Sequence, residues 1–128
     1  MVKNFRELKK NDVFYEVWYY HGYRMAAIKT LRIKKTLTSK YGKYFYTNTI
    51  DVGPSKFCAK FPGYGRFDDK YCVATKMLAS TRYRQSPYSC SVLCTDESKL
   101  DKIVNELRSE SLKICNSMYR EQFKKNLG

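Results

Sequence analysis

Long uncharged runs are absent from this sequence. The longest, residues 85–95, falls well short of the roughly 20 apolar residues that a membrane-spanning helix needs, and it contains Pro87. The first ten residues are interrupted by charges and hold no apolar core of the kind found in secretory signals. We therefore expect no membrane span and no secretory signal. The expected location is the reducing interior of a cell.

Histidine is also scarce, which narrows the enzyme chemistries that the chain could perform. His21 is the only histidine and falls in a predicted turn, so a Ser–His or Cys–His pair has no evident partner. No P-loop, nucleophile elbow or metalloprotease helix occurs in the sequence. A non-enzymatic protein without a cofactor is the leading expectation.

Cysteines are odd in number, and their spacing does not suit a metal. Five thiols without a signal peptide are typical of reduced cysteines in a cytoplasm. Cys90 and Cys94, if extended, lie about 13 Å apart, too far for two thiolates to share a zinc ion. We expect no metal site, and we expect the cysteines to be small buried hydrophobic residues.

Acidic residues are the next deficit: 12 Asp and Glu stand against 25 Lys and Arg, a net charge of +13 over 128 residues. The imbalance is uneven, because residues 1–95 hold 18 basic and 6 acidic side chains, and residues 96–128 hold 7 and 6. Of the 20 aromatic residues, 18 also precede residue 95. The length suits one domain, residues 1–128, with a basic, aromatic body (1–95) and a nearly neutral closing segment (96–128).

The body reads as short strands joined by turns. β-branched and aromatic residues predict strands at 13–20, 23–35, 44–50, 56–61, 70–78 and 88–94, with a bulge near 27–28 and a loop at 80–87. In the third strand, Tyr44 and Tyr46 fall on one face and Phe45 and Thr47 on the other. This order favours an antiparallel meander that curls into a small barrel.

The closing segment predicts a helix with Thr95 as its N-cap and acidic residues in the first turn. Apolar residues recur at three- and four-residue steps from 100 to 119, which lays one apolar stripe along one helix or two. The predicted fold is therefore α+β: a small antiparallel, SH3-like β-barrel or curled sheet, closed by a C-terminal amphipathic helix.

One stretch, residues 24–43, carries seven cations and no acid, with tyrosines close by. Cations on one strand face, beside exposed rings, suit phosphate contacts and base stacking. A solvated edge that keeps the sheet soluble is the alternative. The candidate binding residues of this stretch are Arg24, Lys29, Arg32, Lys34, Lys35, Lys40, Tyr41, Lys43, Tyr44 and Tyr46. An acidic protein surface is the other partner that fits this charge.

The loop at 62–67 adds two candidates. It partly matches the RNA-recognition signature at Gly63, Tyr64 and Gly65, but Pro62 and Arg66 depart from it. We interpret it as a glycine-rich turn in which Tyr64 and Arg66 could contact the same partner.

Both ends of the body resemble a known group of proteins. The residues that carry the resemblance are Phe5, Leu8, Asp12, Phe14, Tyr15, Val17, Leu31 and Ile33, together with the segment 91–100. They are similar to small phage-encoded proteins that form an SH3-like barrel and end in a strand running into an acidic-capped helix. Asn11 stands where that group usually has glycine, and 51–88 looks like an insertion. The resemblance implies the fold and a phage origin, with a role as an early host-directed protein or a minor virion component.

A third possibility is a ribonuclease. Small messenger-RNA-cleaving toxins of the RelE type are short, basic and poor in histidine, and this chain resembles them in composition alone. Arg82, Tyr83 and Arg84 are the nearest cluster of the residue types that those toxins use. Their helices usually come first, whereas here the predicted helix comes last.

Overall fold

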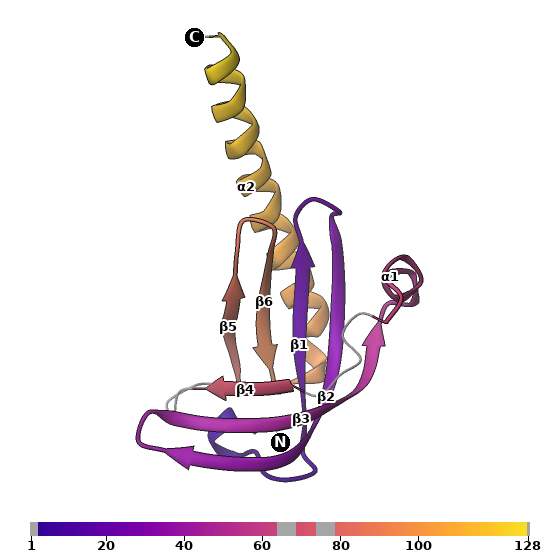
Figure 1. Cartoon of the computed structure of the whole chain (residues 1–128), viewed down its shortest axis with the longest axis vertical. Coiled ribbons are helices and arrows are strands. Elements are labelled where there is room, and N and C mark those ends of the chain that lie inside the picture. Colours follow the sequence, from indigo (N-terminus) through magenta and orange to yellow (C-terminus); the bar gives the residue numbers. More distant parts are fainter. Residues whose placement is uncertain (1–2, 64–68, 74–78, 128) are drawn as a thin grey trace.

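The protein is an α+β fold in which one antiparallel sheet curls into a half-barrel and a long helix follows at the C-terminus (Figure 1). The computed structural model describes residues 3–63, 69–73 and 79–127, and for 114–127 it describes the helix backbone alone. Six strands lie in the order β4-β3-β2-β1-β6-β5. This confirms the predicted SH3-like barrel closed by a helix.

The elements follow one another along the chain in nearly the predicted order. They are η1 (Phe5–Glu7), β1 (Val13–Tyr20), β2 (Met25–Ser39), β3 (Gly42–Gly53), α1 (Ser55–Lys60), β4 (Asp69–Val73), β5 (Ser80–Gln85), β6 (Ser89–Cys94), η2 (Glu97–Lys99) and α2 (Leu100–Leu127). The bounds of β1 are those predicted, whereas β2 and β3 run several residues beyond theirs.

Two predicted segments have a different secondary structure. Residues 56–61 were expected as a strand, but Ser55–Lys60 form the helix α1, which follows Pro54 and buries Phe57 against the sheet. Pro54 has φ near −73°, a value that suits a helix start. Residues 80–87 were expected as a loop, but Ser80–Gln85 pair with β6 as the edge strand β5.

The expected bulge lies elsewhere. The β1–β2 register is regular through Ala27 and Ile28, while the β2–β3 register shifts between Thr30 and Leu31 and again between Ile33 and Lys35. Bulges bend a strand and increase its twist. Their effect is visible in Figure 1, where β2 starts alongside β1 and then turns across the bottom of the sheet.

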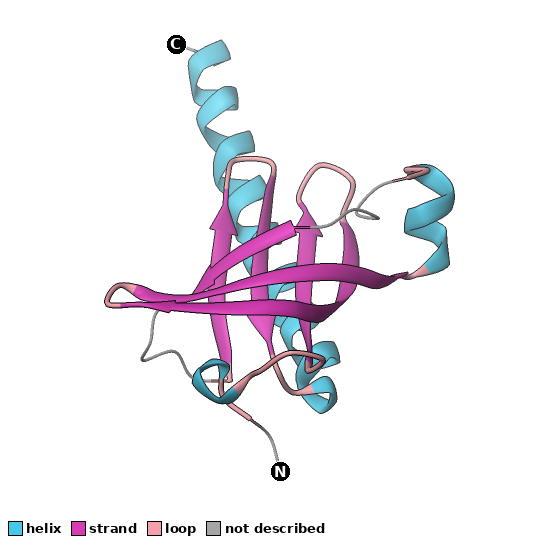
Figure 2. Cartoon of the chain, turned by 60° about the horizontal axis from the view of Figure 1, so that its bottom comes forward, coloured by secondary structure: helices cyan, strands magenta, loops and turns pink. Residues whose placement is uncertain are grey.

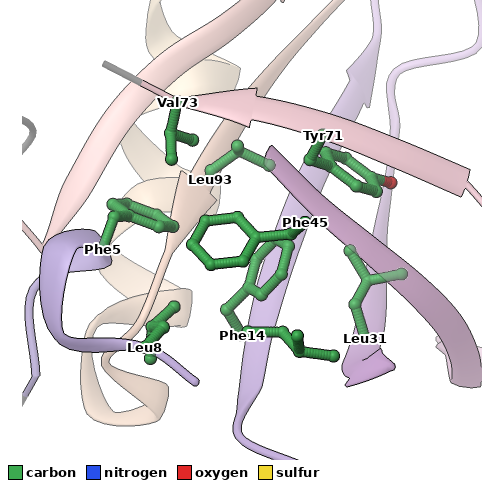
Figure 3. Packing of buried hydrophobic residues seen from close by; sticks show 9 residues of the cluster. Phe5, Leu8, Phe14, Leu31, Phe45, Tyr71, Val73 and Leu93 are labelled. Carbon is green, nitrogen blue, oxygen red and sulfur yellow. The ribbon is translucent and has the colours of Figure 1, made fainter. Parts of the chain in front are cut away.

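The interior of the half-barrel is packed with aromatic rings. Phe14 contacts Phe5 edge-on, with the ring centroids 5.9 Å apart, and also contacts Phe45 at 5.6 Å and Tyr71 at 5.5 Å (Figure 3). All four side chains are fully buried. Because β1, β3, β4 and η1 each contribute one ring, this cluster holds the curled sheet and the N-terminal turn together.

Helix α2 covers the opposite face of the sheet (Figure 2). Leu100, Ile103 and Leu107 pack against Val17 and Val92, so the predicted apolar stripe is confirmed over its first turns. The remainder of the stripe, from 114 onward, lies outside the described side chains. The helix is continuous from 100 to 127, and Asp96 rather than Thr95 caps the turn η2 before it. None of the described helices is long and apolar enough to cross a membrane.

Asn11 occupies the turn before β1 in a conformation that favours glycine. Its φ is 76°, in the left-handed region that asparagine tolerates better than most residues. Its backbone N–H donates to the carbonyl of Ile33, and the N–H of Ile33 donates to the carbonyl of Asp12. Asparagine is therefore compatible with the turn before β1.

His21 joins the β1–β2 turn to α2 and is buried between them. Its ring is 5% exposed, and Nδ1 lies 2.7 Å from the Oγ atom of Ser111. Burial lowers the pKa of His21, so below about pH 6.5 the unfolded chain binds more protons than the folded one, and stability falls. We expect the melting temperature to drop between about pH 7.5 and pH 5.5, and His21→Gln to remove most of that drop. An equal drop in the variant would contradict the assignment.

Candidate nucleic-acid interface

The far half of the β2–β3 hairpin, which we call the arm, crosses below β1, β6 and β5 in Figure 1 and is flanked by β4. Directly paired residues of neighbouring strands lie on the same face of a sheet. Phe45 and Thr47 share one face, as predicted, and that face is the buried interior. The alternate residues form the outer surface, which we call the arm face: Arg32, Lys35, Leu37, Tyr44, Tyr46, Asn48, Lys70 and Cys72.

The arm face combines exposed cations with tyrosine rings. The Nζ atom of Lys70 lies 4.9 Å from the ring centroid of Tyr44 and 5.5 Å from that of Tyr46. Arg32 and Lys35 are exposed on the neighbouring strand, opposite Asn48 and Tyr46. No acidic residue occurs between residues 17 and 50. The face therefore offers positive charge and flat apolar rings within one small area.

The tip of the arm extends this character. Tyr41 is 75% exposed, and the Nζ atom of Lys40 lies 4.9 Å from its ring centroid. The backbone N–H of Tyr41 donates to the Oγ atom of Ser39, which shapes the turn. Lys34 lies at the second bulge of β2 and is exposed beside the arm face. Seven of the predicted residues therefore lie along the arm or at its tip: Arg32, Lys34, Lys35, Lys40, Tyr41, Tyr44 and Tyr46.

Two of the cations that were predicted to lie on the binding surface contact the interior or the N-terminal turn instead. Lys29 is 4% exposed and lies directly opposite Glu16 in the β1–β2 register. The Nζ atom of Lys43 donates to the carbonyls of Leu8 and Arg6, so this lysine fixes the N-terminal turn, and burial lowers its pKa. Both lysines are in phase with the residues of their strands that face the interior, so neither belongs to the arm face.

Other predicted residues do not join the arm face. Arg24 lies in the β1–β2 turn, at the start of β2 and far along the strand from the arm, with φ at 51°. It is therefore not part of the expected cationic ridge on β2. Tyr64 and Arg66 lie outside the described residues.

A buried carboxylate lies behind the arm, inside the half-barrel. Glu16 is fully buried; its Oε1 accepts a hydrogen bond from the Tyr71 hydroxyl at 2.7 Å, and its Oε2 accepts one from Ser91 Oγ at 3.0 Å. Burial, together with this carboxylate, raises the pKa of Tyr71 far above its usual range. The Nε atom of Arg84 lies 3.7 Å from Oε2. This network ties β1 to β4, β5 and β6.

The three residues of the hypothetical ribonuclease cluster are separated by the register shift in β5 between Arg82 and Arg84. Arg82 forms an ion pair with Glu110 of α2, on the helix side. Arg84 instead lies along the inner face of the half-barrel with 43% of its side chain exposed, and its Cζ lies 5.4 Å from the Trp18 ring and 5.3 Å from the Tyr83 ring. Burial alone would lower the pKa of Arg84, but Glu16 and the neighbouring Asp69 outweigh it and raise the pKa.

The cysteines behave as expected in part. Cys90 and Cys94 are buried along the extended strand β6, and burial raises the pKa of both thiols. Cys72 is exposed on the arm face, contrary to the expectation that the cysteines are buried, and the side chain of Cys115 is not described. In the part of the chain that the structure describes, no three His, Cys, Asp or Glu side chains are placed to hold a metal ion.

Sequence reasoning missed Lys70, Leu37 and Cys72 as members of this surface. Lys70 reaches the two tyrosines only because β4 pairs with β3, at a register that the sequence does not show. Leu37 could have been found, since it is directly in phase with Lys35 on the same strand. Comparison of the chain with protein-family models, with curated proteins and with solved structures yields no match.

Proposed function

We propose that the protein is a non-enzymatic binding protein of the phage type, acting in a host cell or as part of a virion, that holds single-stranded DNA or RNA on the arm face. The observation that carries the proposal is the position of Lys70 over the rings of Tyr44 and Tyr46, on a face with no acidic side chain among its described residues. Aromatic rings beside cations are what sequence-tolerant single-strand binding uses.

The spacing of the two rings favours a single strand over a duplex. Residues two apart on a strand are about 6.8 Å apart, roughly twice the 3.4 Å rise of stacked nucleotides in a duplex strand. Each ring would therefore take one base of an extended strand, while Arg32, Lys35 and Lys70 meet the phosphates. A duplex hides its base faces and would gain the phosphate contacts alone.

Substitution of the rings provides the test. We expect the double variant Tyr44→Leu with Tyr46→Leu to weaken binding of a single-stranded oligonucleotide by about 2–6 kcal/mol, since each stacked base contributes about 1–3 kcal/mol. Duplex binding should change little. Fluorescence anisotropy at low salt measures both affinities. The matched control is Tyr88→Leu, because Tyr88 is 80% exposed in the β5–β6 turn, away from the arm.

Two results would overturn the proposal. The first is the absence of detectable binding of the unaltered protein to either single-stranded DNA or RNA at low salt. The second is an equal loss of affinity in the Tyr88 variant, because contact would then not be confined to the arm face.

An acidic protein surface is the second candidate partner, and Leu37 favours it. This side chain is 44% exposed on the arm face, directly opposite Tyr44, where a nucleic acid gains little from an aliphatic group. A virion accessory protein or an inhibitor would bury it together with the cations. Association with an acidic protein that survives nuclease treatment and is lost on Leu37→Ser would support this candidate.

A further inference from the structure

The structure places one carboxylate in a pocket at the base of the arm. Lys34, Tyr46, Thr47, Asp69 and Lys70 line this pocket of about 250 Å³, and they come from three adjacent strands, β2, β3 and β4. The pocket therefore borders the arm face, to which Tyr46 and Lys70 belong and beside which Lys34 lies. Asp69 is its only acidic lining residue among the described side chains.

The Asp69 carboxylate is held in one orientation. Its Oδ1 accepts from the backbone N–H of Lys70 at 2.8 Å, and its Oδ2 accepts from Nη2 of Arg84 at 3.1 Å. The Asp69 carbonyl also accepts from Thr47 Oγ1 at 3.2 Å, which fixes the backbone. A carboxylate has about four lone-pair sites, so two acceptor sites remain for a ligand.

Arg84, which orients Asp69, is itself fixed by its surroundings. Its guanidinium lies against three rings: the Cζ atom is 5.4 Å from the ring centroid of Trp18, 5.7 Å from that of Tyr71 and 5.3 Å from that of Tyr83. Its Nε faces the fully buried Glu16. Such support from behind is what keeps a binding group pre-organised for a ligand.

We propose that this pocket selects guanine within the bound single strand, an inference that rests on the proposed function. The Watson–Crick edge of guanine presents N1–H and the N2 amino group side by side, two donors that match the two free acceptor sites of one carboxylate. Adenine and cytosine present one amino donor beside an acceptor nitrogen, which a carboxylate repels. Uracil presents one N–H between two carbonyls. Lys34 and Lys70, which border the pocket, meet the phosphates of the strand.

The first test varies the ligand. Oligonucleotides of uridine with one central guanine, adenine, cytosine or inosine are titrated against the unaltered protein. A bidentate contact contributes about 1–3 kcal/mol of discrimination, so guanine should bind about 5- to 150-fold more tightly than adenine or cytosine. Inosine lacks the N2 amino group and should lose much of that advantage. Equal affinity for all four inserts, with binding intact, would overturn the guanine preference and leave the proposed function standing.

The second test varies the protein. In Asp69→Asn an amide replaces the second acceptor, so the guanine preference should disappear while affinity for oligouridine is kept. Asp51→Asn is the matched control, since it removes an exposed carboxylate of β3 outside the pocket and should keep the preference. Circular dichroism confirms that each variant folds. A guanine preference retained in folded Asp69→Asn would overturn the assignment of the pocket, whereas no binding of any oligonucleotide would overturn the proposed function itself.

Discussion

Replacing Glu16 with alanine is expected to lower the free energy of unfolding by roughly 2–6 kcal/mol, because two buried hydroxyls lose their acceptor and each unsatisfied buried group costs about 1–3 kcal/mol. The side chain is fully buried and accepts hydrogen bonds from the hydroxyls of Tyr71 and Ser91. Lys29, 4% exposed, lies opposite it in the register. Alanine would leave these polar groups facing a cavity in the centre of the half-barrel.

The variant Glu16→Gln distinguishes the contribution of the charge to stability from that of the hydrogen bonds. The amide keeps one acceptor oxygen and the same volume, so its loss should be smaller, about 1–3 kcal/mol. Urea unfolding followed by fluorescence measures all variants, and Glu106→Ala, at an exposed position of α2, should stay within about 0.5 kcal/mol of the parent. A loss below about 1 kcal/mol for Glu16→Ala would show that the network does not hold the barrel together.

Strands with a strong alternation of side chains could be predicted from the sequence. Tyr44 and Tyr46 point outward and Phe45 and Thr47 inward because only one face of β3 meets the core. The same periodicity defines the first turns of α2. Alternation is a local property, so it does not depend on knowing which strand lies beside which.

Elements decided by distant contacts could not be predicted. The segment of β5 is polar, and it becomes a strand because β6 supplies its hydrogen-bond partners and because Tyr83 packs against the interior cluster. The hydroxyl of Tyr83 also accepts the backbone N–H of Cys72 across the open side of the half-barrel. Tertiary pairing overrides a weak local preference in such a short segment.

The candidate site shows the same division. The run of cations along residues 24–43 indicates the right strand, but the strand period turns Lys29 and Lys43 inward and leaves Arg32 and Lys35 outside. Lys70 arrives from another strand. A count of the cations in residues 24–43 therefore gives the arm face too much charge, because it includes Lys29 and Lys43. The same count leaves out Lys70, which folding brings to this face from β4.

Neutralising the arm face is expected to remove most of the affinity for nucleic acid. In the triple variant Arg32→Gln, Lys35→Gln and Lys70→Gln, three phosphate contacts are lost. For single strands each contact contributes about 0.7 to the slope of log K against log salt, so the slope should fall by about 2. At about 50 mM salt, where each released counterion corresponds to roughly a tenfold change, affinity should fall by about 10²- to 10³-fold.

The matched control removes the same charge from residues that do not belong to the arm face. Lys99→Gln, Lys102→Gln and Lys113→Gln change three exposed lysines of η2 and α2, so both triple variants have a net charge of about +10, from the +13 of the parent. If the arm face binds the strand, the control keeps its salt slope and loses affinity by no more than about threefold, because exposed charges beyond about 10 Å are screened. Equal losses in the two variants would show that the charge of the whole molecule, rather than the arm face, attracts the nucleic acid.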